Sequence, residues 1–307
     1  MTAPSENLAP ALTAARRRTR TAEALRDHLA LARPGVLLLV LLTAPPVFAL
    51  GRPAWPDAVT AFWVLLGTAL VAGGASALNA WIERESDARM RRTRGRPLPA
   101  GRLSADQALR FGAAVSGLGL CVLLGVGGGL AALVGALTLF HYVVVYTLWL
   151  KPRTPQNIVI GGAAGAAAPL IADAALHGSI GIWGLVLFAI VFLWTPPHFW
   201  AIALYRQEEY AAAGFPMMPA VVGDRRTRRK MLVYALAVIP LSLLPWWLGE
   251  LGAVYAATAA LLGAWFVVCI LRSMRARERR EDRRVFFASI AYLWLLFAAM
   301  LVELLLH

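Results

Sequence analysis

Long apolar stretches alternate with short charged blocks along almost the whole chain. A helix needs about 20 apolar residues to cross the hydrocarbon core of a bilayer. Nine stretches reach or approach this length: 35–50, 58–78, 108–126, 130–150, 158–176, 180–204, 231–248, 253–271 and 285–306. The first is short and contains Pro45 and Pro46, so eight spans remain an alternative to nine. The pattern predicts an all-α, polytopic membrane bundle of about nine transmembrane helices.

The distribution of charge agrees with this topology. Of the 307 residues, 59% are apolar and 15% are charged, whereas about a quarter of a soluble domain is charged. With nine spans, the polar segments fall into two alternating sets. One set holds 29 of the 30 Lys and Arg residues, and Arg52 alone lies in the other. Because basic residues resist translocation, the asymmetry predicts a cytoplasmic N-terminus and a C-terminus outside.

The net charge of +13 therefore reflects membrane topology, and we expect no nucleic-acid partner. Residues 1–33 lack the apolar core of a signal peptide and predict a partly disordered cytoplasmic arm. The basic run 16–20 leaves an organelle transit peptide open, although acidic residues on both sides oppose it. Residues 34–307 are predicted to form one membrane domain that contacts lipid directly.

A dense cluster of acidic and basic residues follows the second predicted span. Asn79, Glu83 and Asp87 are spaced i, i+4 and i+8, so on a helix they share one face. Glu85 would point about 200° away from Glu83. Amide and carboxylate oxygens suit Mg²⁺, which also keeps water and phosphate oxygens in its shell. The pattern favours a magnesium or diphosphate site, and the alternative is a solvated loop with surface ion pairs.

Basic residues near this cluster could neutralise a diphosphate group. The predicted diphosphate-binding residues are Arg91, Arg94, Lys151, Arg153 and Arg206. Tyr142 and Tyr146 precede Lys151 on one helical face and point toward the same end of the span. For Lys151 and Arg153 the alternative role is to anchor the topology of a short loop.

The sixth predicted span ends in a second unusual segment. Pro196 and Pro197 should break or kink the helix at membrane depth, and His198 follows them directly. His198 is either a hydrogen-bonded residue of the bundle or a contact to a porphyrin. Glu208 and Glu209 end this segment much as Glu83 and Asp87 follow the second span. Two acidic patches at one depth are typical of metal-assisted diphosphate chemistry.

Three segments, 79–97, 146–165 and 195–219, resemble the membrane-embedded aromatic prenyltransferases. The runs RTRGRPLPAG, YTLWLKPRTPQNIVIGG, WTPPHFWA and AGFPMMPAV are similar to the branch of that family that modifies heme. The resemblance extends from Arg33 to Leu306.

The resemblance implies helices arranged around a central cavity that is open toward the lipid. It implies farnesyl diphosphate and heme B as substrates, Mg²⁺ as cofactor, and heme O as product. The farnesyl group would join the 2-vinyl group of heme B with addition of water. A bacterial plasma membrane is the implied location, and heme A synthase or a terminal oxidase would be the possible partner.

The same resemblance assigns roles to individual residues. The catalytic candidates are Asn79, Asp87, Tyr146, Lys151 and His198, and the metal candidates are Asn79, Glu83, Asp87, Glu208 and Glu209. Relatives that act on quinones carry a second Asp-x-x-x-Asp motif, which falls here at 205–209 with Tyr205 in the first Asp position. Glu208 and Glu209 are the substitutes that we expect for this motif.

Three other functions remain open from the sequence. A quinone or chlorophyll prenyltransferase would share the fold and the acidic motif. A transporter or channel would fit the prolines in the sixth span and the glycine-rich helices, but its polar residues should gather at the membrane midplane. A non-catalytic heme chaperone would bind heme without releasing diphosphate.

Overall fold

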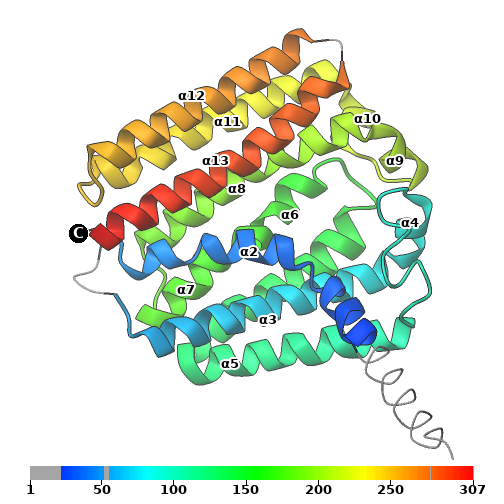
Figure 1. Cartoon of the computed structure of the whole chain (residues 1–307), viewed down its shortest axis with the longest axis horizontal. Helices are drawn as coiled ribbons and strands as arrows, with labels where there is room; N and C mark the ends of the chain where they lie inside the picture. Colours follow the sequence, from blue (N-terminus) through cyan, green and yellow to red (C-terminus); the bar gives the residue numbers. More distant parts are fainter. Residues whose placement is uncertain (1–21, 52–54, 277, 307) are drawn as a thin grey trace, which may run out of the picture.

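The computed structural model describes residues 22–51, 55–276 and 278–306, and every regular element in these ranges is a helix (Figure 1). The predicted all-α fold is confirmed. Most of the arm 1–33 lies outside the described residues, as does Arg52.

Among the residues that the structure describes, seven helical stretches are long and apolar enough to cross a membrane. They are α3 (Ala58–Ile82), α5 with η2 (Ala105–Leu150), α6 with α7 (Asn157–His177), α8 (Ile182–Tyr205), α11 (Asp224–Trp247), α12 (Ala253–Arg275) and α13 (Arg279–Leu306). The first predicted span, 35–50, falls in the second half of a bent pair, Ala22–Leu31 and Pro34–Phe48, whose halves meet at 49° and which counts as an eighth candidate. The second half of this pair contains α2 (Pro34–Leu42) and the 3-10 turn η1 (Pro45–Phe48). The chain is therefore a multi-pass membrane protein.

The 46-residue stretch of α5 (Ala105–Phe140) and η2 (His141–Leu150) folds back on itself. Gly128 has φ 75° and ψ −176°, which an L side chain rarely adopts and which interrupts the helix. Beyond it, a Cβ built on Gly135 would lie 3.0 Å from Leu123 Cδ1. In a straight helix these residues would be about 18 Å apart along the axis. The two halves correspond to the predicted spans 108–126 and 130–150, so the count of nine is approximate and depends on how broken helices are counted.

The helices pack in two groups around a middle layer (Figure 1). Helices α3 and α5 lie side by side, and α8, α11, α12 and α13 form the other group, with α2, α6 and α7 between them. Small residues bring α3 and α5 into backbone contact: a Cβ on Gly74 would lie 2.6 Å from Ser116 N and 2.8 Å from Gly112 O. Such close approach is typical of membrane helices, because dispersion contacts replace the hydrophobic effect there.

Three short helices, α4 (Arg84–Arg89), α9 (Gln207–Ala212) and α10 (Met218–Val222), lie together at one end of the bundle (Figure 1). The C-terminus lies at the opposite end. There, Gly51 N donates a hydrogen bond of 2.7 Å to Glu250 Oε2, which joins two segments that were predicted to share a side. The polar segments therefore alternate between the two ends as the sequence predicts.

Two local predictions need correction. Helix α8 continues through Pro196 and Pro197, so of the predicted break or kink, a break is wrong. A proline removes only its own N–H donor and adds a local clash, and packing within a membrane bundle can accommodate both. In addition, residues His141–Leu150 form a π-helix rather than the end of an α-helix.

Candidate functional site

Asn79, Glu83 and Asp87 follow one another at successive helical turns. Although α3 ends at Ile82, Glu83 N donates to Asn79 O at 2.9 Å and Asp87 N donates to Glu83 O at 2.8 Å. All three side chains are buried, whereas Glu85 is exposed. The structure therefore keeps the predicted spacing and turns Glu85 away from the other two carboxylates.

Lys151 reaches this acidic face from the turn after η2. Its Nζ donates a hydrogen bond to the Glu83 carboxylate and lies 4.7 Å from the centre of the Phe215 ring and 5.7 Å from that of Tyr146. Burial lowers the pKa of Lys151, but the charge and hydrogen bond of Glu83, together with the nearby Tyr146 and Tyr210, outweigh burial and hold the pKa above its usual value. Lys151 is therefore a buried, charged ammonium group held between a carboxylate and two aromatic rings.

Two guanidinium groups complete this cluster. Arg96 Nη1 lies 2.7 Å from Asp87 Oδ2, and Arg33 Nη2 donates a hydrogen bond of 2.8 Å to Asn79 Oδ1. Burial and the positive charge of Arg33 lower the pKa of Arg96, so the two cations act on each other. Sequence reasoning missed Arg33 as a site residue. Its one signal was its place directly before the first apolar stretch.

The π-helix positions the side chains opposite α3. Thr147 Oγ1 donates to Tyr142 O at 2.8 Å, five residues earlier, and accepts a hydrogen bond of 3.0 Å from Asn79 Nδ2. Lys151 N donates to Tyr146 O with the same five-residue spacing. The Tyr142 and Tyr146 rings stack with centroids 5.5 Å apart, as expected for residues on one face. A π-helix is rare and often marks a functional site, because it turns side chains away from their α-helical directions.

The segment after α8 touches the segment after α3. Glu209 accepts hydrogen bonds from Arg206 Nη1 at 2.6 Å and from Arg92 N at 3.3 Å. Glu208 is exposed, and together with Glu209 and Arg91 it lines a groove of about 490 Å³ at the end of the bundle. The two predicted acidic segments therefore meet at one end of the bundle through Glu209 and Arg92.

Of the five predicted diphosphate-binding residues, only Lys151 contacts the acidic face within the described part of the chain, whereas Arg91 and Arg206 line the groove at the end of the bundle. Arg94 is exposed. Arg153 is also exposed, and its Nη1 donates hydrogen bonds of 3.0 Å each to Leu148 O and Trp149 O at the end of η2. The structure brings Lys151 to the acidic face directly, and adds Arg33 and Arg96 to it.

The donor set on α3 and α4 suits a magnesium ion. Within residues 22–51, 55–276 and 278–306, no three Asp, Glu, His or Cys side chains converge as a metal site. Asn79, Glu83 and Asp87 offer only oxygen donors, and Mg²⁺ is typically held by one or two carboxylates together with phosphate oxygens and water. Each of the three now contacts a cation, so a bound ion would share this face with the Lys and Arg side chains.

A largely apolar cavity of about 370 Å³ adjoins this polar cluster. Arg33 and Tyr146, which contact the cluster, form part of its wall. Gly161, Gly162 and Gly165 of α6 form another part of the wall. A Cβ on Gly161 would lie 2.2 Å from Tyr146 Cδ2, so only glycine lets this tyrosine pack here. Nothing lies within 4 Å of a Cβ on Gly165, which leaves that part of the wall open.

His198 of α8 also lines the cavity. Its ring stacks between Trp194 and Phe286, with centroids 4.4 Å and 4.9 Å away, and its Nδ1 lies 2.8 Å from Ser289 Oγ. His141 does not line this cavity, and its Nε2 lies 2.9 Å from the backbone oxygen of Ile160.

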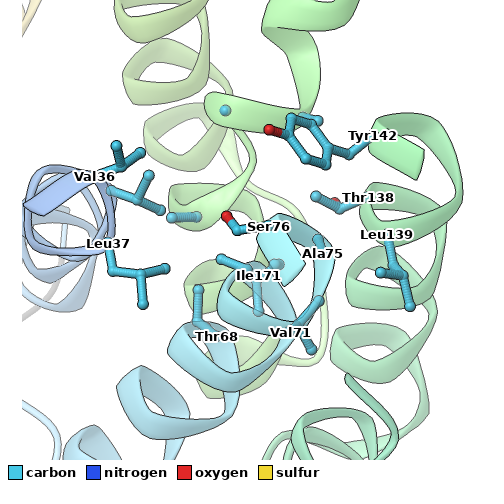
Figure 2. Close-up of a pocket in the computed structure, with 15 residues that line it drawn as sticks. Val36, Leu37, Thr68, Val71, Ala75, Ser76, Thr138, Leu139, Tyr142 and Ile171 are labelled. Carbon is cyan, nitrogen blue, oxygen red and sulfur yellow. The ribbon is translucent and has the colours of Figure 1, made fainter. Parts of the chain in front are cut away.

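A smaller apolar cavity of about 90 Å³ branches toward α3 (Figure 2). Thr68, Val71 and Ser76 of α3 line it, facing Ile171 of α7. Tyr142 lines both cavities. Together, the two cavities offer an apolar space that begins next to a highly charged end.

The comparisons with known proteins agree with this geometry. Residues 37–297 match the model of the UbiA prenyltransferase family. The chain belongs to this family. A relative from Novosphingobium aromaticivorans named protoheme IX farnesyltransferase is 47% identical over 278 residues, which cover 89% of this chain and 91% of the relative.

Solved structures of UbiA proteins share the fold. A structure described as digeranylgeranylglyceryl phosphate synthase has a TM-score of 0.74 at 17% identity and covers 93% of this chain and 100% of its own. A UbiA homologue from Archaeoglobus fulgidus bound to GPP and Mg²⁺ has a TM-score of 0.61 at 17% identity and covers 89% and 99%. Family membership makes the chain a membrane prenyltransferase and disfavours the transporter and chaperone alternatives.

Proposed function

We propose that this chain transfers the farnesyl group of farnesyl diphosphate to the 2-vinyl group of heme B, with addition of water, to give heme O. The observation that carries the proposal is the junction of a charged cluster with an apolar cavity, because the substrate itself joins a charged head to an apolar tail. The relatives named protoheme IX farnesyltransferase, at 42–47% identity, support heme B as the acceptor.

The charged cluster would bind the diphosphate head. Asn79, Glu83 and Asp87 would hold Mg²⁺, which neutralises negative charge on the leaving diphosphate. Lys151, Arg33 and Arg96 now contact those same three side chains. On binding, the cations would turn from the protein oxygens to the phosphate oxygens, so that no charge is left without a partner. Arg91, Arg94, Arg153 and Arg206 would attract the diphosphate from the outer side of this cluster.

The apolar cavities would hold the farnesyl chain and the porphyrin. His198 and the glycines of α6 line the same cavity, and the open space at Gly165 would leave room for the porphyrin. Tyr142 lines both the larger and the smaller cavity, and the smaller cavity would hold the apolar end of the farnesyl group. The walls exclude water from the allylic carbon until the vinyl group has reacted.

The chemistry balances without a redox partner. The bond between the farnesyl carbon and diphosphate oxygen breaks, and the electron pair leaves with the diphosphate. The terminal vinyl carbon then bonds to the allylic carbon and leaves a cation on the carbon next to the porphyrin ring. Water captures this cation and loses one proton. Tyr146 and Lys151 lie at the polar end of the cavity, where departing diphosphate charge needs donors.

The charge asymmetry supports an orientation in which the charged cluster faces the cytoplasm, with the arm 1–33 on the same side. The domain 34–307 would then carry the chemistry together with Arg33, the last residue of the arm, which contacts Asn79. We propose a bacterial plasma membrane as its location. A heme A synthase or a terminal oxidase would receive the product.

The test is a reaction of purified full chain with Mg²⁺, heme B and farnesyl diphosphate, followed by mass spectrometry of the hemes and measurement of diphosphate. We expect heme O and one diphosphate for each farnesyl group transferred. Diphosphate released only with a quinone or chlorophyll-type acceptor would assign the chain to another branch of the family. Binding of heme without any diphosphate release would refute the proposal.

A further inference from the structure

Ser289 of α13 connects the two helices that flank the proposed porphyrin wall. The Ser289 side chain is fully buried, and Ser289 forms hydrogen bonds with Phe286, His198 and Trp194. Ser289 Oγ donates to Phe286 O at 2.6 Å, and the same Oγ lies 2.8 Å from His198 Nδ1. Ser289 O accepts a hydrogen bond of 2.7 Å from Trp194 Nε1. One residue therefore fixes both the imidazole and the indole that stacks on it.

The hydrogen-bond directions determine which nitrogen of His198 carries the proton. A backbone carbonyl can only accept, so the single hydroxyl proton of Ser289 points to Phe286 O. When Ser289 Oγ donates to Phe286 O, its lone pairs can only accept from His198, and Nδ1 then carries the hydrogen. A neutral imidazole has only one N–H, so Nε2 then carries no hydrogen and can donate its lone pair to a metal ion.

Nε2 is the ring nitrogen left for a ligand. Within the described part of the chain it makes no hydrogen bond, and His198 lines the larger cavity. The imidazole stacks on the rings of Trp194 and Phe286, and these contacts restrict its rotation. An oriented imidazole whose other nitrogen donates to a fixed acceptor is the usual arrangement of a histidine that binds a metal.

We propose that Ser289 is a positioning residue that holds His198 in the Nδ1–H tautomer and thereby presents Nε2 to the iron of the bound heme. This inference rests on heme being the acceptor substrate, as proposed above. Iron coordination would fix the porphyrin at one distance from α8. Without it, apolar contacts alone would leave the macrocycle free to slide along the cavity.

The experiment measures binding of ferric heme B and of metal-free protoporphyrin IX to the full chain in nanodiscs, by absorption and by electron paramagnetic resonance. Ser289→Ala should lower the affinity for heme by about 10- to 100-fold and remove the spectrum of imidazole-bound iron. The affinity for the metal-free porphyrin should stay unchanged. His198→Ala should lose the same spectrum, and added imidazole should restore it.

Ser242→Ala is the matched control, because Ser242 is also a buried serine of this bundle and bonds Val238 O and Tyr292 Oη rather than a histidine. It should leave both affinities and the spectrum unchanged. Equal weakening of heme and metal-free porphyrin by Ser289→Ala would show a purely structural role and overturn the inference. An unchanged iron spectrum in His198→Ala would also overturn it.

The two proposals fail separately. If heme O forms but the bound heme never shows an imidazole ligand, the proposed function stands and the inference is wrong. If the ligand spectrum depends on Ser289 and His198 but no diphosphate is released, the inference stands and the proposed function is wrong.

Discussion

The Glu83–Lys151 pair allows the energetics of the charged cluster to be tested directly. The two residues are 6% and 9% exposed, so Glu83→Gln would leave an ammonium group buried without its counter-charge. Breaking a buried ion pair in this way costs about 3–5 kcal/mol. The rings of Phe215 and Tyr146 remain next to the ammonium group and offset about 1 kcal/mol of this cost. We therefore expect a loss of about 3 kcal/mol in the free energy of unfolding.

The assay is reversible unfolding of the full chain in mixed detergent micelles, without ligands. The double variant Glu83→Gln with Lys151→Met removes both charges and should be about 2–3 kcal/mol more stable than the sum of the two single changes predicts. Glu85→Gln is the control, because the Glu85 side chain is 77% exposed. It should change stability by less than about 0.5 kcal/mol.

Two results would refute this reasoning. If Glu83→Gln is no more destabilising than Glu85→Gln, the buried pair does not exist in the membrane. If the two single effects simply add in the double variant, Glu83 and Lys151 do not interact. Because the readout is unfolding in the absence of substrate, neither result depends on the proposed activity.

Three further predictions concern the metal, the cavity and pH. Asp87→Ala should abolish farnesyl transfer while the protein still inserts in the membrane, and chelation of Mg²⁺ should do the same reversibly; normal turnover in either case would exclude the magnesium role. Gly165→Leu should lower farnesyl transfer at least about tenfold without lowering stability, because a side chain there enters open cavity space. Gly117→Leu, at an exposed position on α5, is the control and should have no effect. Equal effects of the two changes would contradict the cavity assignment. The pKa of Lys151 is raised in the folded chain, so the Lys151–Glu83 pair should contribute its full stability below about pH 10.4, the pKa of an unfolded lysine. This contribution should be lost as the pH rises through the higher pKa of folded Lys151. Unfolding measured at each pH should therefore show the stability difference between the original chain and Lys151→Met shrinking only in that alkaline range.

The acidic face illustrates how far sequence spacing reaches. The i, i+4, i+8 spacing placed Asn79, Glu83 and Asp87 together and Glu85 apart, and the backbone hydrogen bonds confirm both. Local spacing succeeds here because helical geometry is set by the backbone over a few residues. The partners of these side chains come from elsewhere: Lys151 lies 68 residues after Glu83, and Arg33 lies 46 residues before Asn79. No local pattern contains those pairings.

The π-helix and helix α8 show the opposite case. An α-helical reading of 141–150 aligns Tyr142 with Tyr146, but it does not predict that Thr147 turns back to Tyr142 O and toward Asn79. The rule that proline ends a helix failed at Pro196 and Pro197, because neighbouring helices hold the backbone in place. In both places tertiary packing overrides the local preference.

The sequence by itself determined the membrane class, the alternation of polar segments between two sides and the chemistry available at one end. These follow from hydrophobic length, from the resistance of basic residues to translocation, and from residue type. Only the tertiary structure decided which charges pair, where the cavity lies, and that Ser289 holds His198 across 91 residues of chain. Contacts between distant segments depend on the packing of whole helices, and that information is spread over the entire chain rather than held in any one motif.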